Sequence, residues 1–332
     1  MKTPPVPTNV ANDTPGIEQI GAPDPSRLPV RATPTFYSTW RMIETTLGVP
    51  RMISHGGELV YHYSDSAGLI GILESDELWA TSTDYLNDPS EGFYTLNVAD
   101  AILRERLSIA KTEKEKLFFN AARAALAEVK PTFYVVSFSR NQDLLSQWRG
   151  YGSFGSGFAL GFDQGELSPI DEVGDLFEMI YDPDKLKAVI NDLIELRLEA
   201  PGNPGDWPAE ISAKGFAYDV AYLSQNCKDP AYSEEREVRL LIGQNGTPPD
   251  SVRARGPAQG GYVRYRTRGS EILPYIASTL TGENEAVRKL PLRHIVMGPG
   301  VPERNRRSLE GLLRSKGYGH VEVSQSRVPF RS

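Results

Sequence analysis

The sequence feature that most constrains the fold is an alternating stretch at residues 232–242, Tyr-Ser-Glu-Glu-Arg-Glu-Val-Arg-Leu-Leu-Ile. In a β-strand, successive side chains point to opposite faces of the sheet. As a strand, this stretch has one face that becomes apolar after Arg236 and enters a core, whereas the other face carries Glu235, Glu237 and Arg239. The pattern suits a catalytic or ligand-binding strand. It suits equally well an exposed strand face that carries a ladder of salt bridges.

Strand and helix patterns are mixed along the rest of the chain, without a regular strand–helix–strand rhythm. Runs rich in β-branched and aromatic residues predict strands at 59–64, 77–82, 132–139, 158–162, 261–266, 272–276, 292–297 and 321–324. Apolar residues at helical spacing predict helices at 67–75, 93–106, 114–129, 143–149, 186–198, 209–225 and 305–316. We therefore expect an α+β fold, with a mixed, mostly antiparallel sheet as its core and flanking helices.

The first part of the chain differs in composition from the rest. Residues 1–34 are rich in Pro, Asn, Thr and Asp and contain few apolar side chains. Such a segment cannot offset its ordering entropy by burying apolar surface, so we expect a disordered Pro-rich tail. Residues 35–332 then form a single α+β domain, a length that one elaborated domain can reach.

Composition limits the classes of partner and site. A formal net charge of −7 argues against a broad basic surface for nucleic acid. A single cysteine, Cys227, rules out a disulfide framework within the chain, and the four His residues are too scattered to form a metal motif. Because the N-terminus lacks a signal-peptide pattern and no apolar run approaches roughly 20 residues, we expect a cytoplasmic protein without a membrane contact.

Two predicted strands carry candidate binding groups. His62 lies in the middle of the first strand, with Tyr61 and Tyr63 on the opposite face, where they can stack on a planar ligand or pack in a core. Ser137 and Ser139 share one face of the strand at 132–139, where hydroxyls can bind a ribose or a phosphate. Each of these residues has an ordinary structural alternative, because strand His and buried strand Ser are common.

A glycine-rich segment follows the helix predicted at 143–149. Its glycines have GxGxxGxG spacing, but a dinucleotide fingerprint needs a strand before it and a helix after it, and here the order is reversed. Trp148, Arg149 and Tyr151 form an aromatic and cationic group beside this loop that can hold an anionic or planar ligand. Asn87 and Asp88 either contribute to a site or form a turn that caps the next helix.

In combination, these motifs resemble a bacterial family called the domain of unknown function 2971 family. The resemblance covers roughly residues 59–331. In the first half of the chain it is carried by Tyr-His-Tyr at 61–63, Leu-Asn-Asp-Pro-Ser-Glu at 86–91, Val-Ser-Phe-Ser at 136–139, and Leu-Leu at 144–145 with Trp148 and Tyr151. Further along it is carried by Leu-Gly-Phe-Asp at 160–163, Glu-Arg-Glu-Val-Arg-Leu at 235–240 and the closing segment 326–331. The chain departs from the family in having Tyr232 where a Trp is common, a long Pro-rich tail and a long glycine loop.

The order of motifs also resembles, more distantly, the ADP-ribosyltransferase superfamily. That resemblance implies a split sheet and the use of NAD as substrate. Glu237 then matches the catalytic carboxylate at the nicotinamide ribose, and Glu235 the residue that activates an acceptor. His62 matches the first-strand residue at the adenosine-side ribose, and Ser137 with Ser139 the Ser-x-Ser pair that shapes the NAD pocket.

The hypothesis is therefore an NAD-using ADP-ribosyltransferase-like enzyme that modifies a protein or nucleic-acid target, as a toxin or phage-defence effector does. We predict no metal cofactor. Two alternatives stay open from the residues alone. One is a metal-dependent hydrolase or nuclease in which the Asp, Glu and His side chains gather around a divalent ion. The other is a non-catalytic module that senses a nucleotide near Trp148, Arg149 and the glycine loop.

Overall fold

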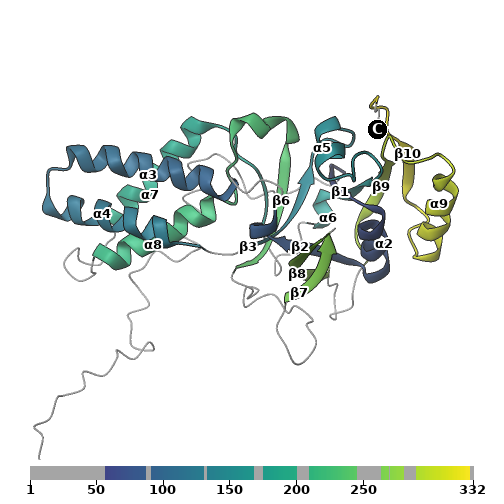
Figure 1. Ribbon diagram of the computed structural model, residues 1–332, viewed down its shortest axis with the longest axis horizontal. Coiled ribbons are helices and arrows are strands. Elements are labelled where there is room, and N and C mark those ends of the chain that lie inside the picture. The colour runs from purple at the N-terminus through teal and green to yellow at the C-terminus, as the bar shows by residue number, and fades with distance from the viewer. Residues whose placement is uncertain are drawn as a thin grey trace, which may run out of the picture. The chain divides into compact units, whose positions relative to one another are not determined.

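The computed structural model describes residues 57–86, 91–130, 133–167, 175–199, 209–244, 263–268, 270–279 and 289–329 (Figure 1). The predicted tail, residues 1–34, lies outside these ranges and stays a prediction. Within the described residues, no helix combines the length and the apolar character that a membrane span requires.

A ten-stranded sheet forms the centre of the described part of the chain. Its main path runs β10-β9-β4-β1-β3-β2-β8-β7, and β6 pairs with both β3 and β5. The strands are β1 Leu59–Ser64, β2 Glu77–Ser82, β3 Phe133–Ser139, β4 Phe158–Asp163, β5 Asp175–Glu178, β6 Glu237–Gln244, β7 Val263–Arg268, β8 Glu271–Thr279, β9 Leu292–Met297 and β10 Glu322–Gln325. Among these pairs only β9 and β10 run parallel, which confirms a mixed, mostly antiparallel α+β fold.

The described helices differ in length and in the hydrophobic core to which they contribute. Of the α-helices, α3, α4, α7 and α8 are the long ones, and they contribute apolar side chains to one common core. The described α-helices are α2 Ser66–Ser75, α3 Glu91–Ile109, α4 Glu113–Glu128, α5 Leu145–Gly150, α6 Gln164–Leu167, α7 Pro183–Glu199, α8 Ala209–Leu223 and α9 Asn305–Ser315. Two 3-10 helices, η2 Thr83–Tyr85 and η3 Pro230–Glu235, complete the described elements.

Strand β3 is the branch point of the sheet. On one edge it pairs with β1 near its end, at Ser139, and with β2 near its start, at Val135. On its other edge β6 pairs with β3 along its whole length. All but one of its side chains are buried, as expected for a strand covered on both faces.

The two faces of β3 enter different hydrophobic cores. Val136 and Phe138 belong to the core that also contains Leu69 of α2 and Leu309 of α9. Phe133 and Val135 belong to the core formed with the long helices α3, α4, α7 and α8. We call these two sides of the sheet the α2/α9 face and the helical face.

The glycine-rich segment, residues 150–157, packs against a second glycine turn at residues 298–300. Gly298 and Gly300 donate backbone hydrogen bonds to the carbonyls of Gly157 and Gly155, at 2.9 and 2.8 Å. A Cβ atom on Gly157 would lie 2.3 Å from the Ser64 carbonyl oxygen, and one on Gly298 would lie 2.4 Å from the Gly155 carbonyl oxygen. Glycine is thus required here for the close approach of two backbones.

This contact gives a testable prediction about stability. We expect Gly157→Ala and Gly298→Ala each to lower the free energy of unfolding by about 1–3 kcal/mol, because the new methyl group meets rigid backbone. Gly150→Ala is the matched control, because nothing lies within 4 Å of its Cβ position. Chemical denaturation measures all three variants. Equal stabilities for Gly157→Ala and Gly150→Ala would contradict this explanation of the loop.

Candidate functional site

The stretch expected to be one strand over 232–242 is divided into two elements, and this part of the prediction is wrong. Pro230–Glu235 forms the 3-10 helix η3, and strand β6 begins only at Glu237. Asp229 starts the 3-10 turn by accepting a hydrogen bond from the Ala231 amide. Arg236 then adopts a left-handed conformation, with φ 43°, which turns the chain into the strand. Glu235 and Glu237 therefore do not share a strand face through alternation.

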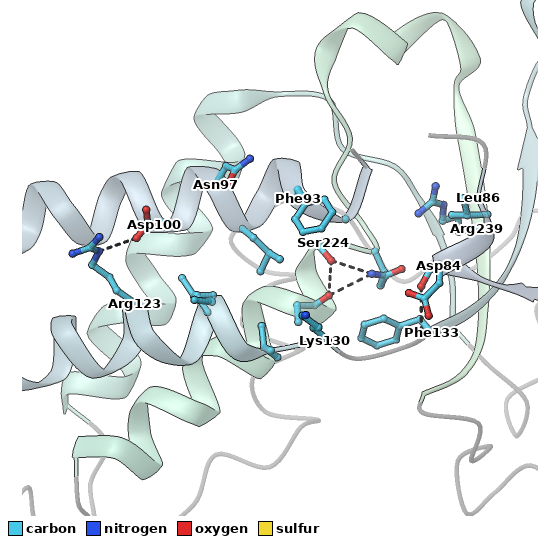
Figure 2. A pocket seen from close by; sticks show the side chains of 18 of the residues that line it. Asp84, Leu86, Phe93, Asn97, Asp100, Arg123, Lys130, Phe133, Ser224 and Arg239 are labelled. Atoms are coloured by element: carbon cyan, nitrogen blue, oxygen red, sulfur yellow. Dashed lines mark hydrogen bonds and ion pairs between the residues drawn. The ribbon is translucent and has the colours of Figure 1, made fainter. Parts of the chain in front are cut away.

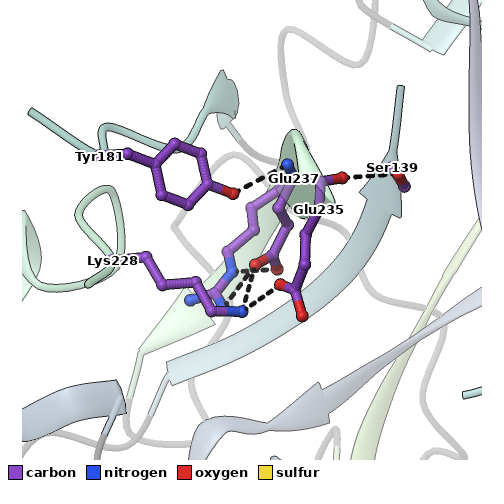
Figure 3. Close-up of polar contacts among 6 residues, drawn as sticks. Ser139, Tyr181, Lys228, Glu235 and Glu237 are labelled. Atoms are coloured by element: carbon purple, nitrogen blue, oxygen red, sulfur yellow. Dashed lines mark hydrogen bonds and ion pairs between the residues drawn. The ribbon is translucent and has the colours of Figure 1, made fainter. Parts of the chain in front are cut away.

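The two carboxylates nevertheless meet, at an ammonium group from another segment (Figure 3). Lys228 Nζ lies 2.6 Å from Glu235 Oε2 and 3.0 Å from Glu237 Oε2. Arg239 Nε lies 2.6 Å from Glu237 Oε1. The exposed fractions are 3% for the Lys228 side chain, 9% for Glu235, 6% for Glu237 and 2% for Arg239. We call these four residues the buried ion cluster.

The cluster balances two negative charges with two positive charges away from water. Burial by itself raises the pKa of the Glu237 carboxyl, because it disfavours the charged form. The charges of Arg239 and Lys228, with hydrogen bonds from Arg239 and Ser137, outweigh burial and lower the pKa of Glu237 from 4.5 to about 2. Glu237 is therefore a permanent anion near neutral pH, a state that suits electrostatic stabilisation of positive charge rather than proton donation.

Hydrogen bonds from β3 and from the segment after β5 fix the backbone around the cluster. Ser139 Oγ donates to the Glu235 carbonyl at 2.6 Å and accepts from the Asn141 amide at 3.0 Å. The Glu237 amide donates to Tyr181 Oη at 3.0 Å (Figure 3). The Ser139 hydroxyl, predicted to shape a ligand pocket, is thus engaged with the turn that positions Glu235.

Sequence reasoning missed Lys228 and Tyr181. Lys228 follows Cys227, which forms a β-bridge with Ile180, and this bridge sets the lysine beside Tyr181. No periodic pattern contains Lys228, because it lies in the short connection between α8 and η3. The one signal available was a lysine within ten residues of a pair of glutamates, a weak indication by itself.

His62 lies on the opposite side of the sheet from the buried ion cluster. The pairing of Tyr61 with Ser139, and of Ser139 with Glu237, places these three side chains on the helical face. His62 alternates to the α2/α9 face, where its ring meets Phe138 edge to face at a centroid distance of 5.9 Å. His62 Nδ1 lies 2.9 Å from the Ser137 carbonyl oxygen. Burial lowers the pKa of the His62 imidazole, which favours the neutral ring.

The aromatic residues near the glycine loop form a packed group. Tyr63 and Trp148 meet edge to face at 4.8 Å, and Trp148, which is fully buried, donates from Nε1 to Asp143 Oδ1 at 2.7 Å. Tyr63 Oη donates to the Asn141 carbonyl, and Tyr61 Oη donates to Gln142 Oε1. These contacts hold the chain after β3 against β1.

The remaining predicted site residues are separate from the cluster or lie outside the described part of the chain. Arg149 is exposed, and Tyr151 is 36% exposed beside the glycine loop. Asn87 and Asp88 lie outside the described residues.

The gathering of Asp, Glu and His side chains around a divalent ion, the basis of the metal alternative, is not observed among the described residues. There, no group of three or more His, Cys, Asp or Glu side chains is arranged to hold a metal ion. The Lys228 ammonium lies between the Glu235 and Glu237 carboxylates, at the position where a bridging cation would bind.

The low pKa of Glu237 predicts a specific pH dependence of stability. A carboxyl with a lower pKa in the folded state stabilises the fold above its unfolded pKa of about 4.5, and this contribution disappears as the pH falls toward about 2. We therefore expect Glu237→Gln to be less stable than the wild type at pH 7, with a difference that shrinks steadily between pH 4.5 and 2. Unfolding free energies measured across this range test it. A constant difference would contradict the assignment.

One family model matches the part of the chain that contains the buried ion cluster. Residues 147–240 match the model of a family described as "Protein of unknown function (DUF2971)". No curated protein and no solved structure matches the chain. The matched range runs from α5 to β6 and includes Lys228, Glu235, Glu237 and Arg239. Over these residues, the match supports the resemblance of this chain to the domain of unknown function 2971 family.

Proposed function

We propose that the protein is an NAD-using, ADP-ribosyltransferase-like enzyme that modifies a protein or nucleic-acid target. One observation carries the proposal: the strands with the His, Ser-x-Ser and Glu motifs, β1, β3 and β6, are direct neighbours in the sheet. Tyr61, Ser139 and Glu237 form one cross-strand row on the helical face. Residues separated by about 175 positions in the sequence are thus adjacent in the sheet, which supports the proposal.

The chemistry assigned to Glu237 follows from its charge. Transfer breaks the bond between ribose C1′ and the nicotinamide nitrogen, and the bonding electron pair leaves with nicotinamide. Positive charge then develops on the ribose, and a fixed carboxylate stabilises it. An acceptor oxygen or nitrogen forms the new bond to C1′ and releases a proton, for which Glu235 is the proposed acceptor.

Access to Glu237 sets a condition on this mechanism. Its carboxylate is bound by Lys228 and Arg239 and is almost completely buried. Arg239 also lines a cavity on the helical face (Figure 2). The proposal requires the substrate to reach Glu237 from that side. Because His62 lies on the other face, the proposal gives it no part in the bond-breaking step. A toxin or phage-defence role stays a prediction.

The direct test is release of nicotinamide from NAD, with water or an added cell extract as the source of the acceptor. We expect turnover by the wild type, and a loss of about 100-fold or more in Glu237→Gln, because the variant lacks the charge that stabilises the ribose. Glu234→Gln is the matched control, because Glu234 is the exposed neighbour whose side chain lies outside the cluster.

Thermal unfolding of both variants establishes that each is folded at the assay temperature. Absence of NAD binding and of nicotinamide release by the wild type, or equal rates for the wild type and Glu237→Gln, would overturn the proposal.

A further inference from the structure

Strand β7, at one end of the main path of the sheet, carries three arginines that differ in their partners (Figure 1). Arg264, Arg266 and Arg268 alternate along the strand, so their side chains lie on one face. Arg264 Nη1 lies 3.1 Å from Glu77 Oε2, and Arg268 Nη2 lies 2.9 Å from Glu271 Oε2. Among the described residues, no carboxylate forms an ion pair with Arg266, the arginine between them.

Contacts with β2 hold the Arg266 guanidinium in one position. Its Nη2 donates to Thr81 Oγ1 at 2.9 Å, and its central carbon lies 5.6 Å from the centroid of the Trp79 ring, a cation–π contact. The Trp79 ring is itself fixed. Tyr275 packs on it at a centroid distance of 5.4 Å, and a Cβ atom on Gly71 of α2 would lie 2.3 Å from its Cη2. The cation is therefore pre-organised, which lowers the cost of binding a ligand.

The group around Trp79 is open to the surface. Arg266, Trp79 and Tyr275 are each half-buried. Two guanidinium nitrogens of Arg266 have no hydrogen-bond partner among the described residues, and of these Nε is shielded from solvent whereas Nη1 is not. The Tyr275 hydroxyl likewise has no partner within the described ranges and is not shielded. A ligand at the surface can therefore accept hydrogen bonds from Arg266 Nη1 and from Tyr275.

The charges around Arg266 do not neutralise it by direct contact. Burial lowers the pKa of the Arg266 guanidinium, because it disfavours the charged form, and the charge of Arg268 lowers it further. Asp65 and Tyr275 act in the opposite direction. The Asp65 carboxylate, however, accepts a hydrogen bond from the first turn of α2 at 2.7 Å as the N-cap of that helix. Within the described part of the chain, Arg266 is thus a half-buried cation without a direct counter-ion, a state that a bound anion stabilises.

We propose that Arg266 binds the phosphate group of a ligand at the surface where β2, β8 and β7 meet. Phosphate oxygens accept from Arg266 Nη1 and from the Tyr275 hydroxyl, and their charge neutralises the guanidinium. Arginine suits this role because its planar donors match phosphate oxygens. A phosphate monoester carries about −1.5 to −2 charges near pH 7 and gains more from such a cation than a carboxylate does. The inference concerns binding and does not require the transfer step assigned to Glu237.

Thermal unfolding of the full chain in sodium phosphate, against sodium chloride at equal ionic strength, tests the proposal. We expect the melting temperature of the wild type to rise with phosphate concentration, because a ligand that binds the folded state stabilises it. Phenyl phosphate is the second probe. Tighter binding of phenyl phosphate assigns the site to a phosphorylated ligand, whereas tighter binding of inorganic phosphate assigns it to the free ion, and both results support the proposal.

A substitution at the proposed site separates specific binding from general effects of the salt. Arg266→Met removes the cation and lowers the affinity for phosphate by about tenfold or more, the effect of losing a hydrogen bond to a charged group. Arg307→Met is the matched control, because it is the same change at an exposed arginine of α9. This variant responds to phosphate like the wild type.

A second substitution tests the other contact without changing a charge. Tyr275→Phe keeps the ring that packs on Trp79 and lowers the affinity for phosphate by about threefold or more, because one donor is lost. A retained phosphate response in Glu237→Gln separates this site from the proposed enzymatic step. The proposal is refuted if neither probe stabilises the wild type more than sodium chloride does, or if phosphate stabilises Arg266→Met as much as the wild type.

Discussion

The buried ion cluster of Lys228, Glu235, Glu237 and Arg239 is the interaction on which this region of the protein depends. Two carboxylates and two cations are removed from water together, and each charge has an opposite charge within 3.0 Å. Loss of one partner from such a pair typically costs about 3–5 kcal/mol, because it leaves a buried charge without compensation. The cluster joins the connection after α8, the turn of η3 and the start of β6. The Ser139 hydroxyl of β3 holds the η3 turn, and the Ser137 hydroxyl binds the Glu237 side chain.

The same interaction shapes the chemistry that this region can perform. Because Arg239 and Lys228 keep Glu237 ionised, the carboxylate is suited to stabilise positive charge and unsuited to donate a proton. Arg239 connects the cluster with the cavity on the helical face, since its guanidinium contacts Glu237 and the residue is also part of the cavity wall.

Local patterns predicted most of the fold, and tertiary contacts explain the differences. Strand β1 was predicted at its observed bounds, Leu59–Ser64, because the alternation of side chains acts within a few residues. Residues 232–236 follow a strand pattern but form a turn, because the side chains of Asp229 and Ser139 bind the backbone of this segment. The sequence pattern does not show the second contact, since Ser139 is distant in the sequence. For the same reason the sequence did not reveal that Lys228 joins the two glutamates. Nor did it reveal that the glycine loop packs against Gly298.

The central claim is that Lys228 and Glu235 stabilise the fold as a coupled pair. A double-mutant cycle with Lys228→Met, Glu235→Gln and the double variant tests it most directly, through the free energy of unfolding at pH 7. The account predicts that the two changes are strongly non-additive, with a coupling energy of about 1–3 kcal/mol, because the second change removes a charge that the first left without its partner. Changes that add to within about 0.5 kcal/mol would contradict it.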